Sequence, residues 1–182
     1  VLSRGDTLSN VIGMSLDGDN VEQVATVNQL NGSFNIELLR SLEGQDTGRI
    51  SPSTLDTYVA GDDVEETNLL SADFDGDGFT ELIASNPMAD TSNNTSAGIV
   101  FITKTNSSGL TANVIALEGS SDNAHYGKGL AVGDFNADGF DDLAIGSPGE
   151  SIVEIYFGSQ SGLSNVSDQI LSGNSTDEFG SD

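Results

Sequence analysis

Residues 134–142 read Asp-Phe-Asn-Ala-Asp-Gly-Phe-Asp-Asp. Oxygen-bearing side chains stand at positions 1, 3, 5 and 9 of this nonapeptide, and position 6 is a glycine, which tolerates positive φ in a sharp turn. Hard cations such as Ca²⁺ take about six to eight oxygen ligands, so a short chain must bring alternate side chains together and then turn. In that geometry the expected ligands are the side-chain oxygens of Asp134, Asn136, Asp138 and Asp142 and the backbone carbonyl of Phe140.

The same pattern occurs 61 residues earlier, at residues 73–81. Two copies in one register, each followed by an apolar run, favour metal sites over Asp- and Gly-rich turns that hold no metal. An EF-hand needs a bidentate acid at position 12, where these copies have Ala84 and Ile145, so neither copy is a helix–loop–helix site. We therefore expect about two Ca²⁺ ions. The ligands expected in the earlier copy are Asp73, Asp75, Asp77, the backbone carbonyl of Phe79, and Glu81.

The composition excludes several classes of partner. The chain has 182 residues, with 29 acidic and 5 basic residues and a net charge of −24. Nucleic acids and anionic membrane surfaces would repel it, and no apolar run of about 18 residues is present for membrane insertion. The chain has no cysteine, so disulfides play no part. It starts at Val1 without a basic-then-apolar leader, which we interpret as a processed product or an excised piece.

Short apolar runs separated by turn residues predict an all-β fold. The period of about 60 residues, with four strands per unit and the acidic loop between the first and second strands, favours β-propeller blades. The sequence predicts about three four-stranded antiparallel repeats. Strands are expected at Phe34–Leu39, near Tyr58-Val59, and at Gly98–Ile102, Asn113–Leu117, Ile152–Phe157 and Asp168–Leu171.

A degenerate copy of the loop lies at residues 15–23. There Ser15 replaces the first Asp, Asn20 the Gly and Gln23 the last acid of the complete copies, so we expect weak metal binding or none. The pattern predicts this organisation: an irregular lead-in at 1–10, a degenerate repeat at 11–64, repeats with calcium loops at 65–125 and 126–178, and the start of a further, truncated repeat at 179–182.

Together these residues resemble the FG-GAP repeats of the integrin α-subunit β-propeller. Tyr126-Gly127 and Phe179-Gly180 stand where that family has Phe-Gly, and residues 129–134 and 146–148 resemble its Gly-Ala-Pro-bounded segment. In that family the acidic loop binds Ca²⁺ between two strands of a blade, and the resemblance implies this role for both ligand sets. Glu81 departs from the usual Asp. Closed propellers have about four to eight blades, so we expect part of a larger or assembled propeller, completed by blades of the same longer chain or of another chain.

The resemblance implies a calcium-stabilised interaction or adhesion module, extracellular or at the cell surface, with a protein or glycan ligand. A lectin-like carbohydrate-binding propeller, or the propeller part of a secreted carbohydrate-active or hydrolytic enzyme, is the alternative. We expect no enzyme activity, because the chain has no Cys, no Gly-x-Ser-x-Gly motif and a single histidine, His125, placed as a loop residue. Arg4-Gly5-Asp6 is interpreted as a polar turn near a chain end.

Overall fold

The computed structural model describes residues 7–14, 23–30, 33–42, 45–50, 67–106, 109–174 and 179–181, with the backbone alone for the ranges before residue 67. All regular structure in these ranges is β-strand, and no helix there is long and apolar enough to cross a membrane. The strands are β1 (Thr7–Met14), β2 (Gln23–Leu30), β3 (Ser33–Leu42), β4 (Gln45–Ile50), β5 (Leu69–Ala72), β6 (Glu81–Asn86), β7 (Ile99–Asn106), β8 (Gly109–Glu118), β9 (Leu130–Gly133), β10 (Asp142–Ser147), β11 (Ile152–Tyr156) and β12 (Gln169–Ser172).

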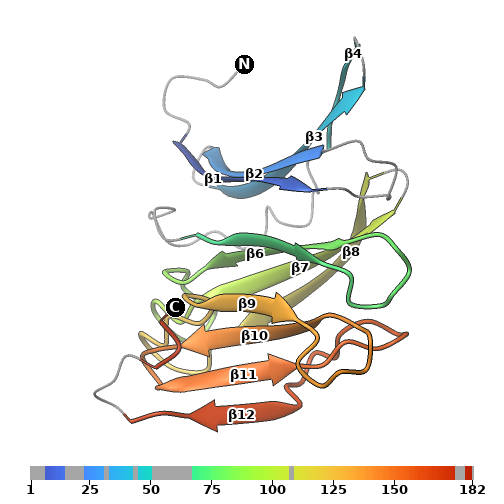
Figure 1. Ribbon diagram of the computed structural model, residues 1–182. Coiled ribbons are helices and arrows are strands. Elements are labelled where there is room, and N and C mark those ends of the chain that lie inside the picture. Colours follow the sequence, from blue (N-terminus) through green and yellow to red (C-terminus); the bar gives the residue numbers. More distant parts are fainter. Residues whose placement is uncertain are drawn as a thin grey trace.

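The strands form four-stranded antiparallel meanders. Within the described ranges the sheets are β1 to β4, β5 to β8 and β9 to β12, and each strand pairs with its neighbours in the chain. Figure 1 shows the three sheets stacked in chain order, with β1 to β4 at one end and β12 at the other. The first strands of successive sheets contact each other, since β5 touches both β1 and β9. This is the arrangement of propeller blades, whose first strands lie side by side.

Each sheet opens with the same hairpin. Ala72 pairs with Glu81 at the end of β5, and Gly133 pairs with Asp142 at the end of β9, so the acidic loops connect the first and second strands. In the first sheet Met14 pairs with Gln23 across an equally long connection. The predicted position of the acidic loop within a repeat is therefore confirmed.

Two of the sheets are described as complete blades, rather than the three repeats we predicted. These are β5 to β8 and β9 to β12, whose side chains pack on each other. The first sheet shares their strand order, but its side chains and the loop at residues 15–22 lie outside the described residues. Two blades are thus supported, and the prediction of weak metal binding at residues 15–23 stays a prediction.

The main core lies between the two complete blades. Strand β6 is buried along its whole length, whereas β12 at the outer edge of the last sheet is exposed. Large buried side chains from both blades meet there, and fully burying each such side chain stabilises the fold by about 1.5–3 kcal/mol. The cluster comprises Ala72, Phe74, Ile83, Val100, Ile102, Leu117, Tyr126, Leu143, Ile145 and Tyr156.

The strands predicted in the second and third repeats are present, but β7 extends four residues beyond Ile102 and β8 begins four residues before Asn113. One prediction is wrong: β1 begins at Thr7, inside the lead-in predicted to be irregular at 1–10. Strand β4 was missed because its sequence, Gln-Asp-Thr-Gly-Arg-Ile, has no apolar alternation. The strand expected near Tyr58-Val59 lies outside the described residues.

Candidate metal centre

The first acidic loop is closed by its own side chains. The backbone N–H of Gly78 donates to Asp73 Oδ2 (3.1 Å), and the N–H of Asp77 donates to Asp75 Oδ1 (3.2 Å). The N–H of Phe79 donates in turn to Asp77 Oδ1 (2.9 Å). Gly78 has a φ of +86°, in the left-handed region that favours glycine, as the turn at position 6 requires. The carboxylates therefore face the inside of the loop.

The second loop repeats this hydrogen-bond pattern. The N–H of Gly139 donates to Asp134 Oδ2 (2.9 Å), and the N–H of Asp138 donates to Asn136 Oδ1 (2.8 Å). The N–H of Phe140 donates to Asp138 Oδ1 (3.0 Å). Residues 61 positions apart thus make the same contacts, so the two loops share one backbone design.

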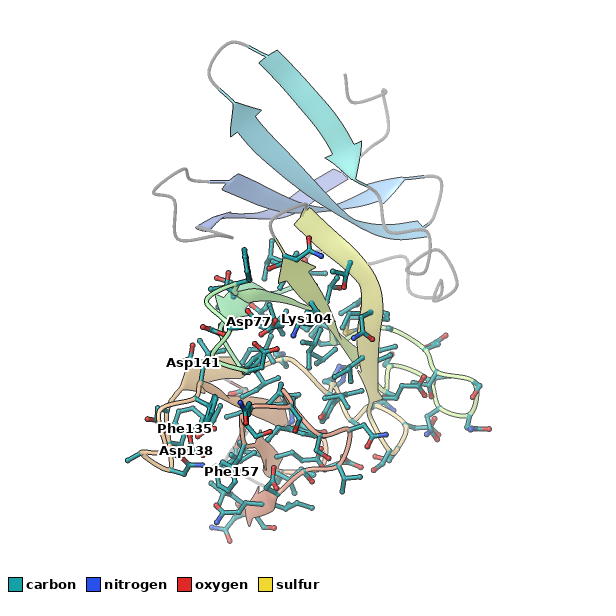
Figure 2. The ribbon with its side chains drawn as sticks, turned by 90° about the vertical axis from the view of Figure 1, so that its right-hand side faces the viewer. Asp77, Lys104, Phe135, Asp138, Asp141 and Phe157 are labelled. Carbon is teal, nitrogen blue, oxygen red and sulfur yellow. The ribbon has the colours of Figure 1, made fainter. Side chains whose placement is uncertain are left out.

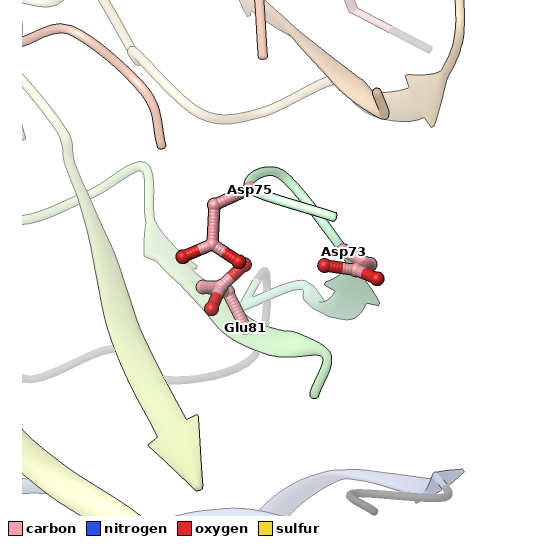
Figure 3. A group of neighbouring side chains, drawn as sticks. All are labelled: Asp73, Asp75 and Glu81. Atoms are coloured by element: carbon pink, nitrogen blue, oxygen red, sulfur yellow. The ribbon is translucent and has the colours of Figure 1, made fainter. Parts of the chain in front are cut away.

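Three acids of the first loop come together. Asp73, Asp75 and Glu81 each offer one carboxylate oxygen, and these oxygens lie within 4.8 Å of one another (Figure 3). Glu81 is only 5% exposed, and its Oε2 accepts the N–H of Phe74 (3.0 Å). The other oxygen, Glu81 Oε1, and Asp73 Oδ1 are buried with no hydrogen-bond partner.

Such buried and unpartnered oxygens fit a bound cation. A buried acceptor without a partner is destabilising by about 1–3 kcal/mol, and by more when it is charged. An oxygen-liganded ion such as Ca²⁺ would satisfy both oxygens and neutralise the neighbouring carboxylates. The residues present therefore fit the predicted metal.

The environment of Glu81 also disfavours its charged form. Burial raises its pKa most, and the negative charges of Asp75 and Asp77 raise it further. The Phe74 N–H and the ammonium of Lys104 act in the opposite direction. The resulting pKa is about 7, so a bound cation would favour the ionised form of this carboxylate near neutral pH.

Asp77 lies outside this three-acid group. Its carboxylate faces Lys104 on β7 (Figure 2), with Nζ 3.3 Å from Asp77 Oδ2. The same ammonium forms an ion pair with Asp75. Lys104 was missed at the sequence level because it follows the loop by more than 20 residues. Only the pairing of β7 with β6 brings it to the site.

The second loop is more open, and its buried acid is fully bonded. Asp134, Asn136 and Asp138 are exposed, whereas Asp142 is completely buried. Asp142 Oδ2 accepts the N–H of Phe135 (2.7 Å), and its Oδ1 accepts the N–H of Gly158 (2.8 Å). Among the described residues, no second group of three acids as close as the first is found. The second ligand set stays a prediction.

The second blade also makes hydrogen bonds to the first loop. The N–H of Asp73 donates to Asp141 Oδ2 (3.0 Å), and the N–H of Ser159 donates to the carbonyl of Phe74 (3.0 Å). Gly76 leaves room for the ring of Phe140, which a Cβ at residue 76 would approach to 2.9 Å. The first site is therefore built from both blades.

These hairpins and four-stranded antiparallel sheets are consistent with the blades of a β-propeller. The FG-GAP repeat family matches residues 67–102 and 126–164, which cover β5, β6 and the first half of β7 in one blade and β9 to β11 in the next. The chain thus contains FG-GAP repeats, as its sequence predicted.

The chain is a distant homologue of integrin alpha subunits and of phosphatidylinositol-glycan-specific phospholipase D. It is 37% identical over 112 residues to integrin alpha-PS5 of Drosophila melanogaster, covering 57% of this chain and 11% of that protein. It is 37% identical over 111 residues to integrin alpha-7 of Homo sapiens, covering 58% and 9%. To the phospholipase D of Mus musculus it is 33% identical over 108 residues, covering 52% and 13%. The match spans only a small part of each relative.

Proposed function

We propose that the chain is a Ca²⁺-stabilised interaction or adhesion module of the FG-GAP propeller type. The observation that supports it best is the pair of buried, unpartnered oxygens on Asp73 and Glu81, in a loop that lies within the first stretch matched by the FG-GAP repeat family. The ion fixes the hairpin between the first two strands of a blade. Because the second blade packs on that hairpin through Asp141, the ion also stabilises the contact between blades.

An extracellular or cell-surface location agrees with this role. Extracellular Ca²⁺ modules use sites with Kd on the order of 10⁻⁴–10⁻³ M. The net charge of −24 leaves an acidic surface of about −20 after two Ca²⁺ ions bind, which keeps the module soluble in a calcium-rich medium. The ligand is proposed to be a protein or a glycan.

Calorimetric titration with Ca²⁺ tests the metal sites. We expect two sites in the unchanged chain, one lost in Asp75→Ala and the other in Asn136→Ala. Glu118→Gln is the control, since it removes an exposed carboxylate of β8 outside both loops. Full-strength binding at two sites in the combined Asp75→Ala and Asn136→Ala variant would contradict the assignment.

A second candidate is the propeller part of a carbohydrate-active or hydrolytic enzyme, or a lectin-like propeller. The similarity to a phosphatidylinositol-glycan-specific phospholipase D favours it. Glycan-array binding without turnover would support the lectin role, and hydrolysis products would support an enzyme. Retained binding to a protein ligand with no glycan signal would support the adhesion role.

Further blades are the proposed structural partners, from the same longer chain or from another chain. In the last sheet β10 is almost wholly buried, as β6 is in the middle sheet, but β9, β11 and β12 are largely half-buried or exposed. A sheet covered on one side needs another layer on its second face. Light scattering is the test: a monomer of the 182-residue chain with a closed-ring profile would contradict this proposal.

A further inference from the structure

Lys104 places a positive charge inside the first acidic loop. Its ammonium pairs with Asp75 and lies 3.3 Å from Asp77 Oδ2, so it binds two of the predicted calcium ligands. The Asp75 side chain is 7% exposed and that of Lys104 is 38% exposed. The ammonium therefore reaches a largely buried carboxylate from the solvent side.

The strand pairing identifies the equivalent residue in the next blade. Leu82 pairs with Thr103 between β6 and β7, and Leu143 pairs with Tyr156 between β10 and β11. Leu82 and Leu143 are equivalent, since they follow the last acid of their loops. The residue after Thr103 is Lys104, and the residue after Tyr156 is Phe157, so the second blade has an aromatic ring where the first has an ammonium (Figure 2).

A second difference matches the first. Asp75 at position 3 of the first loop corresponds to Asn136 in the second. The amide Nδ2 of Asn136 donates to Asp138 Oδ2 (2.9 Å), the oxygen equivalent to the one that Lys104 approaches on Asp77. Each loop thus has a nitrogen donor at the equivalent carboxylate oxygen. In the first loop the donor is Lys104 of the third strand, and in the second it is Asn136 of the loop itself.

The two differences between the loops, Asp75 against Asn136 and Lys104 against Phe157, offset each other in net charge. With every predicted ligand carboxylate ionised, the ligands of the first loop carry four negative charges beside one ammonium, and those of the second carry three negative charges with no ammonium. The fourth acid of the second loop, Asp141, accepts the N–H of Asp73 in the first blade. The pair Asp75 and Lys104 in one blade replaces the neutral pair Asn136 and Phe157 in the other. Lys104 is therefore the counter-ion of the extra carboxylate.

Lys104 lines the same cavity as two of the predicted metal ligands. A cavity of about 140 Å³ is lined by Lys104 together with the predicted ligands Asp75 and Glu81, and by Asn113 and Ser161 on its polar walls. An ammonium and a divalent cation repel each other at such short range. The cavity gives the lysine side chain room to move away from the carboxylates when an ion enters.

We propose that Lys104 is a built-in competitor of Ca²⁺ at the first loop. It holds Asp75 and Asp77 together without metal, and Ca²⁺ displaces its ammonium from them. The second loop binds Ca²⁺ without this competition. The inference rests on the proposed metal function and adds that the two sites are unequal because of this one side chain.

Calcium titrations of Lys104→Met and Phe157→Lys test the inference. Because a partly exposed ion pair is weak, we expect Lys104→Met to raise the affinity of the first site by about two- to fivefold. The second site should not change. Phe157→Lys should weaken the second site by a similar factor, and Lys104→Arg should retain the affinity of the unchanged chain.

The unfolding midpoint in excess chelator gives a second readout. Lys104→Met should lower this midpoint while it tightens calcium binding, whereas a merely structural lysine would lower both the midpoint and the affinity. Two bound ions with an unchanged or weakened first site in Lys104→Met would overturn the inference. An absence of calcium binding in the unchanged chain would instead refute the proposed metal function. If Lys104→Met does not fold, unchanged second-site affinity in Phe157→Lys overturns the inference.

Discussion

The hydroxyl oxygens of Tyr126 and Tyr156 lie 2.8 Å apart, and both hydroxyls contact one oxygen of Glu154. Tyr126 stands where the family has the Phe of its Phe-Gly pair. Tyrosine therefore adds a hydroxyl to the core at this position. Glu154 Oε2 accepts from Tyr126 at 3.0 Å and from Tyr156 at 2.7 Å. Burial raises the pKa of both tyrosines, and the Glu154 charge raises it further, so both stay neutral donors.

Removing the Tyr126 hydroxyl should destabilise the fold. We expect Tyr126→Phe to lower the free energy of unfolding by about 1–3 kcal/mol, because the hydroxyl loses its hydrogen bond to the Glu154 carboxylate and its contact with the Tyr156 hydroxyl while the ring packing remains. Glu154→Ala should lower it by about 1–3 kcal/mol, since two buried hydroxyls lose their acceptor. Urea unfolding in saturating Ca²⁺ measures both, with exposed Glu118→Ala as the control. A Tyr126→Phe variant as stable as the unchanged chain would show that the hydroxyl cluster contributes nothing.

Gly98 is required where the blades meet. Its φ is +85°, and a Cβ there would lie 2.3 Å from the backbone oxygen and 2.5 Å from the backbone nitrogen of Tyr126. Gly98→Ala should therefore destabilise the fold by more than about 3 kcal/mol or prevent folding, because the blocking atoms are backbone. Gly162 is a matched control: its φ is +82°, but nothing lies within 4 Å of the added Cβ. Gly162→Ala should lose only about 1–2 kcal/mol from backbone strain. Equal unfolding midpoints for the two variants would contradict this close-packing argument.

The sequence predicted the acidic loops well because their geometry is local. Asp134, Asp138 and Gly139 lie within six residues of one another, and the Asp134 carboxylate accepts the backbone N–H of both Asp138 and Gly139. The pairing of Gly133 with Asp142 also follows from the loop length. Short-range chemistry of this kind can be read from residue types and spacing alone.

Contacts that depend on strand pairing or on polar edge strands could not be read in the same way. Lys104 approaches Asp75 only because β7 pairs with β6 in one particular register. Strand β4 pairs with β3 although its residues are mostly polar, so its hydrogen-bonded neighbour decides its conformation. The same limit applies to Asp141, which bonds the first loop from the second blade.

Calcium affinity at the first site should decrease as the pH falls below neutral. In the metal-free chain the pKa of Glu81 is raised from 4.5 to about 7, chiefly by burial, so Ca²⁺ must displace a proton at pH 6. A carboxyl with a raised pKa stabilises the fold below pH 4.5, and this contribution is lost as the pH rises towards 7. The metal-free chain should therefore become less stable over that interval. Calorimetry at pH 6 and pH 8, in buffers of different ionisation enthalpy, measures the released proton. Equal first-site affinity at both pH values would contradict the prediction, and Glu81→Gln should remove the proton release.

Glu150 should give the opposite pH dependence. Burial alone would raise its pKa, but hydroxyl hydrogen bonds from Ser120, Ser121 and Ser147 together lower it. A lowered pKa means that the ionised carboxylate stabilises the fold at neutral pH, and this contribution is lost as the pH falls through the lowered pKa. In the Glu150→Gln variant the loss of stability under acidic conditions should be smaller than in the unchanged chain. Identical acid unfolding curves would contradict the role of this carboxylate.

Removing calcium should lower the melting temperature, and the second loop should open more than the first. At a Ca²⁺ concentration of about 100 times Kd, each site stabilises the native state by about 2.7 kcal/mol. For a chain of this size that is a shift of about 5–10 °C per site.

In the first loop Lys104 still neutralises part of the charge after the ion leaves, whereas the second loop keeps only the amide of Asn136. Hydrogen exchange in excess chelator should therefore rise more at residues 134–142 than at residues 73–81. The combined Asp73→Asn and Asp134→Asn variant is the control, and its melting temperature should not respond to chelator. An unchanged melting temperature of the unaltered chain in excess chelator would show that the fold does not depend on the ion.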